Sequence, residues 1–201
     1  MGIEIPQNKF LILDGAMGTV LQQRGLSPQG RPELLNLTEP ELLDSVYKEY
    51  IAAGSQVIYA NTFGANGLKL AKTGHSVEEV VGAAIAVAKK AAAGTGTLVA
   101  LDVGPLGELL EPMGTLSFER AYDLFREMAE AGAKAGADLI VVETMTDLYE
   151  AKAALLAAKE AAHLPVFVTM SFDAGGRTFT GCTVASMART LEGLGADAIG
   201  L

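Results

Sequence analysis

A chain of 201 residues with 50% hydrophobic residues is long enough to bury a substantial core in one or two domains. Its formal net charge of −9 argues against a nucleic-acid partner, because binding to phosphate groups needs a basic surface. The apolar segments are strand-length or interrupted by charge, so we expect no membrane span, and residues 1–6 lack the basic region of a secretory signal. A single cysteine, Cys182, excludes an internal disulfide framework and predicts a cytoplasmic protein.

Short apolar runs recur along the chain, and all but the last stop on a polar side chain. They are residues 10–14, 56–61, 97–102, 138–143, 166–171 and 197–201. Continuous apolar runs of this length are typical of buried parallel strands. The polar residues at their ends fall where α/β proteins place their chemistry, at the carboxyl ends of the strands. The last run reaches residue 201 before any polar side chain follows.

Segments with helical periodicity separate these runs. The predicted helices run from Thr38 to residue 53, from Ser76 to about residue 94, from Ser117 to residue 132 or 136, from Asp147 to residue 161, and from Thr183 or Ser186 to residue 193 or 195. Each begins at a residue type that can cap a helix, and Thr38 has Glu41 at the spacing of a capping box. The resulting order is β-α five times and then a sixth strand, which predicts right-handed crossovers and a parallel sheet.

Polar or turn-forming residues follow every complete strand, which favours a closed barrel over a doubly wound sheet with its single switch point. A complete (β/α)8 TIM barrel needs about 250 residues. We therefore predict an α/β fold, a (β/α)8 barrel truncated to about (βα)5 plus a sixth strand. Its first and sixth strands would lack neighbours unless the rest of the barrel or an oligomer covers them. Residues 22–37 form the longest irregular stretch, and on a barrel they would lie over the mouth as a lid or entrance wall.

Three of the strand ends carry candidate binding residues in turns. Asp14 is followed by Gly15 and Ala16, and such a turn lets backbone N–H groups approach an anionic ligand, although an ordinary βα turn explains it equally well. Asn61 and Asn66 follow the second strand and could contact a small polar ligand, with Asx-turn chemistry slightly favoured for Asn66. Asp102 ends the third strand and either points to the mouth or caps its own turn.

Glu143 ends the fourth run directly after Leu-Ile-Val-Val. A carboxylate at that position is unfavourable unless it meets a cation or several donors, and a ligand ammonium would be such a partner. Asp147 is better explained as a helix N-cap, and Asp173 as part of a hairpin turn. Cys182 has no neighbouring histidine and is interpreted as a small hydrophobic residue. The sequence thus predicts a site for a small zwitterion, without a clear nucleophile or metal triad.

Taken together in order and spacing, four motifs resemble the homocysteine-binding, N-terminal module of cobalamin-dependent methionine synthases, in the homocysteine S-methyltransferase family. The motifs are Asp14-Gly-Ala-Met-Gly-Thr19, Asn61-Thr-Phe-Gly-Ala-Asn66 with Lys69-Leu70, Asp102-Val-Gly-Pro-Leu-Gly-Glu108, and Val142-Glu-Thr-Met-Thr-Asp147. The resemblance spans essentially the whole chain. Residues 1–201 would then be the N-terminal part of a homocysteine-binding barrel domain.

The resemblance implies roles for these residues. Asp14 and Glu143 would recognise the substrate ammonium, and the amides around Gly15 and Ala16 its carboxylate. Asn61, Asn66 and Asp102 would line the same mouth. The family's Zn²⁺ is held by three cysteines expected beyond Leu201. Zn²⁺ would activate the homocysteine thiol, which accepts a methyl group from methylcobalamin, recharged from 5-methyltetrahydrofolate, on separate cobalamin- and folate-binding modules.

Two other functions fit the same sequence. One is a free-standing homocysteine methyltransferase that uses betaine or S-methylmethionine, which shares the barrel and the zinc. The other, of a different class, is a non-catalytic barrel fragment or amino-acid-binding unit.

We expect the isolated chain to bind no stoichiometric zinc and to transfer no methyl group, because Cys182 is its single thiol and the resemblance requires three. Elemental analysis of the purified chain checks this expectation. One tightly held zinc per chain would contradict it.

Overall fold

The computed structural model describes residues 10–27 and 30–201, so the prediction about a secretory signal at residues 1–6 falls outside the described residues. The strands are β1 (Val57–Tyr59), β2 (Leu98–Val103), β3 (Leu139–Met145), β4 (Val166–Met170) and β5 (Ala198–Gly200). The helices are α1 (Met17–Gln23), the 3₁₀ helix η1 (Pro32–Leu34), α2 (Leu35–Thr38), α3 (Pro40–Ala52), α4 (Gly67–Leu70), α5 (Val77–Ala92), α6 (Phe118–Ala135), α7 (Leu148–Ala162) and α8 (Val184–Gly193).

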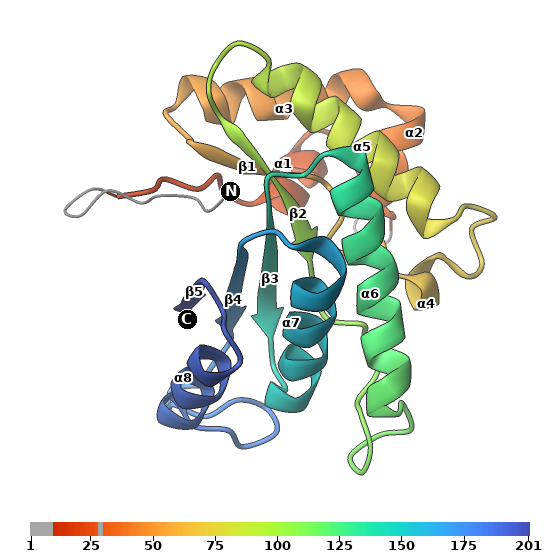
Figure 1. Ribbon diagram of the computed structural model, residues 1–201. Coiled ribbons are helices and arrows are strands. Elements are labelled where there is room, and N and C mark those ends of the chain that lie inside the picture. Colours follow the sequence, from red (N-terminus) through yellow and green to blue (C-terminus); the bar gives the residue numbers. More distant parts are fainter. Residues whose placement is uncertain (1–9, 28–29) are drawn as a thin grey trace.

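The strands form one parallel sheet in the order β1-β2-β3-β4-β5, so that each strand pairs with its neighbours in the sequence. A doubly wound sheet would place strands side by side out of sequence order. Sequential pairing is the winding of a barrel, with the helices on its outer side. Figure 1 shows α3, α5, α6 and α7 lying together on one side of the curved sheet. The prediction of an α/β fold with barrel-type winding is confirmed.

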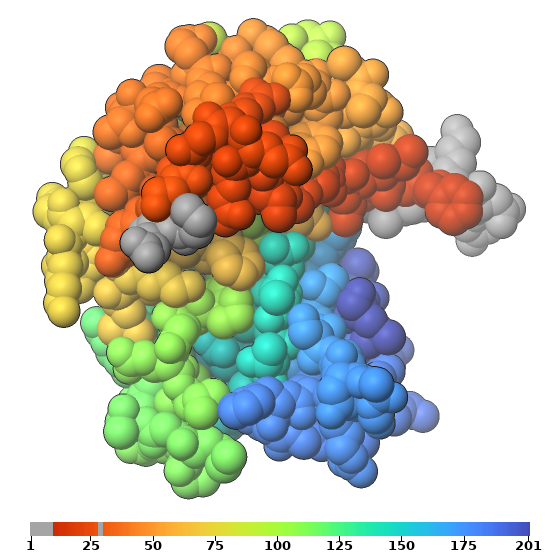
Figure 2. Space-filling model, turned by 180° about the vertical axis from the view of Figure 1, so that it is seen from behind, coloured from red at the N-terminus to blue at the C-terminus, as the bar shows by residue number. Residues whose placement is uncertain are grey.

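The two faces of the sheet belong to different hydrophobic clusters, and the alternation is visible within β3. Ile140 and Val142 join the large cluster between the sheet and the helices. Leu139 and Val141 join a smaller cluster on the opposite, inner face, which no helix residue enters among the described residues. Figure 2 views the molecule from behind, where the teal residues around β3 are visible between the red-orange α1 region and the blue C-terminal part.

Four of the helix starts follow the predicted capping chemistry. The side chains of Ser76, Ser117, Asp147 and Thr183 each accept a hydrogen bond from a backbone N–H two or three residues ahead, at the start of α5, α6, α7 and α8. The αL residue Gly136 ends α6, as is typical of a helix C-terminus.

The first predicted helix begins differently from the prediction. Thr38 is the last residue of α2 and does not cap α3. Its hydroxyl donates instead to the carbonyl of Leu34 at 3.2 Å, because a threonine inside a helical turn can satisfy the carbonyl four residues back. The prediction of a Thr38 cap was therefore wrong, and α3 begins at Pro40 without a side-chain cap.

The first apolar run does not form a full strand. Within residues 10–14, Leu13 makes an isolated parallel bridge to Val57, and the Asp14 N–H donates to the Val57 carbonyl at 3.0 Å. The chain then turns at Gly15 into α1, a helix that the sequence did not predict. The run still lies along the edge of β1, so the position that it was expected to occupy is correct. None of the helices in residues 10–27 and 30–201 is long and apolar enough to cross a membrane.

Close packing of α6 on β2 depends on a missing side chain. A Cβ atom at Gly132 would lie 2.7 Å from Cδ2 of the fully buried Leu101, whereas a Cβ at Gly82 in α5 would meet nothing within 4 Å. The outer helices can therefore approach the sheet at Gly132 only because this position has no side chain.

We expect Gly132→Ala to destabilise the chain and the matched control Gly82→Ala to stabilise it. Both substitutions gain about 0.5–1 kcal/mol from helix propensity. Overpacking against Leu101 costs Gly132→Ala about 1–3 kcal/mol. Urea unfolding of both variants checks the difference, and equal shifts in the free energy of unfolding would contradict close packing at this point.

Candidate functional site

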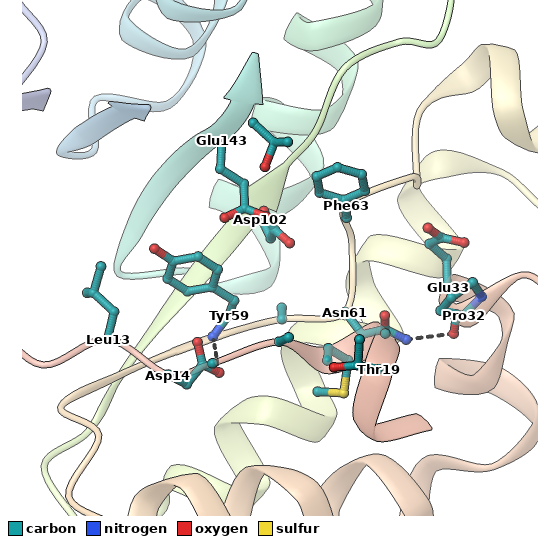
Figure 3. Close-up of a pocket in the computed structure, with 16 residues that line it drawn as sticks. Leu13, Asp14, Thr19, Pro32, Glu33, Tyr59, Asn61, Phe63, Asp102 and Glu143 are labelled. Carbon is teal, nitrogen blue, oxygen red and sulfur yellow. Dashed lines mark hydrogen bonds between the residues drawn. The ribbon is translucent and has the colours of Figure 1, made fainter. Parts of the chain in front are cut away.

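A cavity of about 580 Å³ lies at the carboxyl ends of β1, β2 and β3 (Figure 3). Its lining residues are Leu13, Asp14, Gly15, Ala16, Met17, Gly18, Thr19, Pro32, Glu33, Tyr59, Ala60, Asn61, Phe63, Asp102, Glu143 and Thr144. Of the residues that the sequence singled out, all but Asn66 are among them. Acidic side chains are present, and none of these sixteen described residues is Lys, Arg or His. The cavity thus has negative charge without a lining cation.

Strand periodicity explains how three of the lining side chains reach the cavity. Tyr59 follows Val57 by two residues on β1, Asp102 follows Ala100 on β2, and Glu143 follows Val141 on β3. Because side chains alternate across a strand, each lies on the same inner face as the apolar residue before it. Each inner row therefore changes from apolar to polar where the strands end.

Asp14 enters the cavity from the turn beside β1. Its Oδ2 accepts a hydrogen bond from the Tyr59 N–H at 3.0 Å, while its buried Oδ1 has no hydrogen-bond partner among the described residues. Burial, with a smaller contribution from the nearby Glu143 carboxylate, raises the pKa of Asp14 from 3.8 to about 7. Below that pH, a neutral carboxyl group is favoured at this position until a cation arrives.

Burial also raises the pKa values of Asp102 and Glu143. Asp102 is 8% exposed, and its Oδ1 also has no hydrogen-bond partner within the described ranges. Burial raises the pKa of Asp102 well above its usual range, and the charges of Glu143 and Asp14 raise it next. Burial likewise raises the pKa of Glu143. Unpartnered oxygens and raised pKa values are both expected where a site is built for a cationic group that the protein itself does not supply.

A backbone irregularity sets the position of Glu143. The register between β3 and β4 shifts between Val142 and Met145, and Thr144 has a φ of +59°. Positive φ is strained for a β-branched residue, and such bulges redirect side chains next to binding sites. Thr144 also lines the cavity. No residue pattern predicts this bulge, because Thr-Met-Thr is equally typical of a strand and of a loop.

Tyr50 holds the turn formed by Asp14, Gly15 and Ala16. Its hydroxyl donates to the Ala16 carbonyl at 3.0 Å, and a Cβ atom at Gly15 would lie 3.0 Å from the same hydroxyl oxygen. A Cβ atom at position 15 would therefore crowd the tyrosine ring, which would have to shift by a few tenths of an ångström. Both Gly15 and Ala16 line the cavity, and their binding of a ligand carboxylate stays a prediction.

Asn61 lines the cavity and also builds its wall. Its Nδ2 donates to the Pro32 carbonyl at 2.6 Å, and its own carbonyl accepts from Asn36 Nδ2 at 2.8 Å. These bonds fix η1 beside the site, so that Pro32 and Glu33 become lining residues (Figure 3). Pro32 and Glu33, within the predicted loop of residues 22–37, thus lie in the cavity wall, and other described parts of that stretch are helical. Glu33 was not singled out as a site residue in advance.

Asn66 does not line the cavity. It is fully buried, and its Oδ1 accepts hydrogen bonds from the N–H groups of Leu68 and Lys69, which makes it the N-cap of α4. Lys69 then donates to the Pro105 carbonyl at 2.8 Å and lies 5.5 Å from the centre of the Phe63 ring. The structure therefore gives Asn66 the kind of local role that its motif slightly favoured, and not a place among the lining residues. Through Lys69 it supports the cavity wall.

No group of three or more His, Cys, Asp or Glu residues in residues 10–27 and 30–201 is arranged to hold a metal ion. Cys182 donates to the Thr183 carbonyl at 3.3 Å and lies beside a second, shallow cavity with Asp147 and Lys152, not at the site described above. The residues present do not fit the three-thiolate zinc centre that the resemblance implies, and no chemical step is assigned to a metal here.

Comparisons with known proteins converge on one family. The family model described as Homocysteine S-methyltransferase matches residues 11–201. Methionine synthases from Mycobacterium tuberculosis and Mycobacterium leprae are each 31% identical to the chain over 219 aligned residues, which include 99% of this chain. The chain spans 18% of the length of these curated relatives.

Solved structures of a homocysteine methyltransferase are also similar to this chain. The homocysteine methyltransferase MmuM from Escherichia coli in its metallated form superposes with a TM-score of 0.84 at 25% identity, covering 96% of this chain and 74% of that one. Its oxidized form gives 0.85 at 26% identity, with 96% and 73% covered. The carboxyl transferase domain of Rhizobium etli pyruvate carboxylase, with a TM-score of 0.52 at 19% identity over 80% of this chain and 24% of that one, is similar in fold alone.

We expect Asp14→Asn to increase stability in alkaline solution. The folded-state pKa of Asp14 is about 7 against 3.8, so its ionisation destabilises the folded chain progressively as the pH rises between these values. The neutral variant should match the parent near pH 4 and exceed it by about 1–2 kcal/mol above pH 8, since one pKa unit is worth about 1.4 kcal/mol and solvent screens part of it.

Urea unfolding as a function of pH measures this difference. The exposed Asp123 on α6 supplies the matched control Asp123→Asn, which should show no such pH-dependent gain. A gain of the same size in both variants would contradict a specific effect of burial at Asp14.

Proposed function

The chain belongs to the homocysteine S-methyltransferase family, and on that basis we propose that its cavity binds homocysteine as the acceptor of a methyl group, in the reaction that forms methionine. The observation that carries this proposal is the set of buried carboxyl groups with unpartnered oxygens and no cation among the lining residues. An α-amino acid supplies the missing positive charge.

The chain's own residues would recognise the amino-acid half of homocysteine. A primary ammonium has three N–H donors and needs acceptors close by. Asp14 Oδ1 is such an acceptor, and Glu143 lies on the neighbouring inner row. Binding of the ammonium favours the ionised carboxylates and offsets their desolvation. The turn at Gly15 and Ala16, held by Tyr50, would receive the ligand carboxylate, and Asn61 would close the mouth through η1.

We further propose that residues 1–201 are the N-terminal part of a homocysteine-binding barrel domain. The E. coli MmuM chain, of which this chain covers 74%, supports this. Zinc would then be held by cysteines that are not among these 201 residues, and bound zinc supplies a thiolate nucleophile at neutral pH. No residue described here replaces it.

For the methyl donor we propose methylcobalamin, itself methylated by 5-methyltetrahydrofolate, with cobalamin- and folate-binding modules as partners in a cytoplasmic enzyme. The 31% identity to two methionine synthases supports this choice. The structural similarity to MmuM supports the second candidate, a methyltransferase that takes its methyl group from a small donor such as betaine or S-methylmethionine. Continuation of the reading frame into cobalamin- and folate-binding modules distinguishes the two candidates.

We expect calorimetry to detect homocysteine binding to the chain without added Zn²⁺. Asp14→Asn and Glu143→Gln should each weaken binding by about tenfold or more, because losing a charged partner of a buried ammonium costs about 2 kcal/mol or more. The analogue 4-sulfanylbutanoate, which lacks the ammonium, should not bind measurably.

Asp123→Asn, which removes one exposed negative charge far from the cavity, is the control and should bind homocysteine as the parent does. If Asp14→Asn and Glu143→Gln retain the parent's affinity, the ammonium is not recognised by these carboxylates. Binding of 4-sulfanylbutanoate as tight as that of homocysteine leads to the same conclusion.

A further inference from the structure

Four carboxyl groups line the cavity, and the proposed ammonium site uses those of Asp14 and Glu143. Of the other two, Glu33 and Asp102, the buried one is Asp102. It lies near the end of β2, the strand between β1 and β3, and only 8% of it is exposed. Its backbone is fixed, since its N–H donates to Thr62 Oγ1 at 3.0 Å and its carbonyl accepts from the same hydroxyl at 2.7 Å. Its side-chain Oδ1 is buried without a hydrogen-bond partner among the described residues.

Within the described residues, the groups that interact electrostatically with Asp102 are acidic groups and tyrosines. They are Glu143 of β3, Asp14 of the turn beside β1, Glu33 of η1, Tyr59 of β1 and Tyr47 of α3. The half-buried Lys69 of the cavity wall donates to the Pro105 carbonyl, and the charges that act on it are those of Glu33 and Glu150. None of the basic groups in residues 10–27 and 30–201 is among those that act on Asp102.

The net charge of the loaded site depends on whether Asp102 carries a proton. If Asp14, Asp102 and Glu143 were all ionised, three carboxylates would face one ammonium, an excess of two negative charges in a poorly solvated place even before the ligand's own carboxylate is counted. Removing the charge from the most buried carboxyl relieves most of this penalty. Asp102 is the most buried of the three. Burial followed by the charges of Glu143 and Asp14 raises its pKa well above the usual range, in agreement with this assignment.

We propose that Asp102 works as a neutral carboxylic acid: it keeps its proton in the empty and the loaded site, and its O–H donates to a neighbouring carboxylate once the ammonium is bound. Asp14 and Glu143 alone then pair with the ammonium. The identity of the ligand rests on the proposed function, whereas the protonation of Asp102 does not. Asp102 is a positioning residue in this scheme, and its O–H supplies a donor that an ionised carboxylate lacks.

Asparagine is the natural probe of this assignment, because its amide has the shape of a carboxylic acid and likewise offers one acceptor oxygen together with N–H donors. Asp102→Asn should keep the affinity for homocysteine within about threefold of the parent, while Glu143→Gln loses about tenfold or more. Asp102→Ala, which removes the hydrogen-bonding group, should bind about five- to tenfold more weakly.

Calorimetry with homocysteine measures all three affinities. If Asp102→Asn loses as much affinity as Glu143→Gln, Asp102 is a charged partner of the ammonium and the proposal is overturned. If Asp102→Ala binds as tightly as the parent, Asp102 positions nothing and the positioning role is overturned. Should Asp102→Ala fail to fold, the comparison of Asp102→Asn with Glu143→Gln still decides.

A second measurement needs no ligand and separates this proposal from the proposed function. In the chain carrying ¹³C at aspartate side-chain carboxyl carbons, the resonance missing from Asp102→Asn identifies Asp102. It should remain at the position of a protonated carboxyl well above the ordinary aspartate pKa of about 3.9. Titration near that ordinary value would overturn the proposal even if homocysteine binds. If homocysteine does not bind the parent chain, the proposed function fails while this titration still reports on Asp102.

Discussion

The parallel pairing of β1 to β5 in sequence order determines where the cavity lies and which side chains enter it. Because each strand pairs with the next one in the sequence, all carboxyl ends meet at one edge of the sheet. The side-chain alternation of the strands then places Tyr59, Asp102 and Glu143 on one inner face. The outer helices bury the other face in a continuous apolar core, and this burial supplies the stability that holds acidic groups together against their mutual repulsion.

Around that edge, neutral polar groups fix the backbone. Tyr47 accepts from the Asn61 N–H, Tyr50 donates to the Ala16 carbonyl, and Thr62 bonds both backbone groups of Asp102. These contacts satisfy backbone groups that would otherwise be buried unpaired. Among the described residues, none donates to Oδ1 of Asp14 or to Oδ1 of Asp102. A rigid frame with unsatisfied acceptors is poised for a ligand that brings its own donors and positive charge.

The cavity residues would bind one end of the proposed ligand, and other parts of the domain would bind the other end. The described residues provide for the polar end of an amino acid, with carboxyl groups, a tight turn and a wall. They do not provide a set of metal ligands. In the proposed function the thiol end of homocysteine therefore depends on other parts of the domain, while charge balance at the amino end depends on which carboxyl group remains neutral.

The β-α alternation, the helix caps at Ser76, Ser117 and Asp147, and the strand ends that carry carboxyl groups follow from the sequence alone, because these features depend on local periodicity and neighbouring residues. Thr183 was one of two candidate caps for the last helix, and local turn chemistry was already the favoured interpretation of Asn66. Three features became visible only in the folded chain: Thr38 ends a short helix instead of capping α3, Glu33 lines the cavity on a segment held through Asn61, and Thr144 has a positive φ at a bulge. The features at Glu33 and Thr144 depend on contacts between distant segments, the Asn61–Pro32 hydrogen bond and the β3–β4 pairing, which leave no signal in the order of residues.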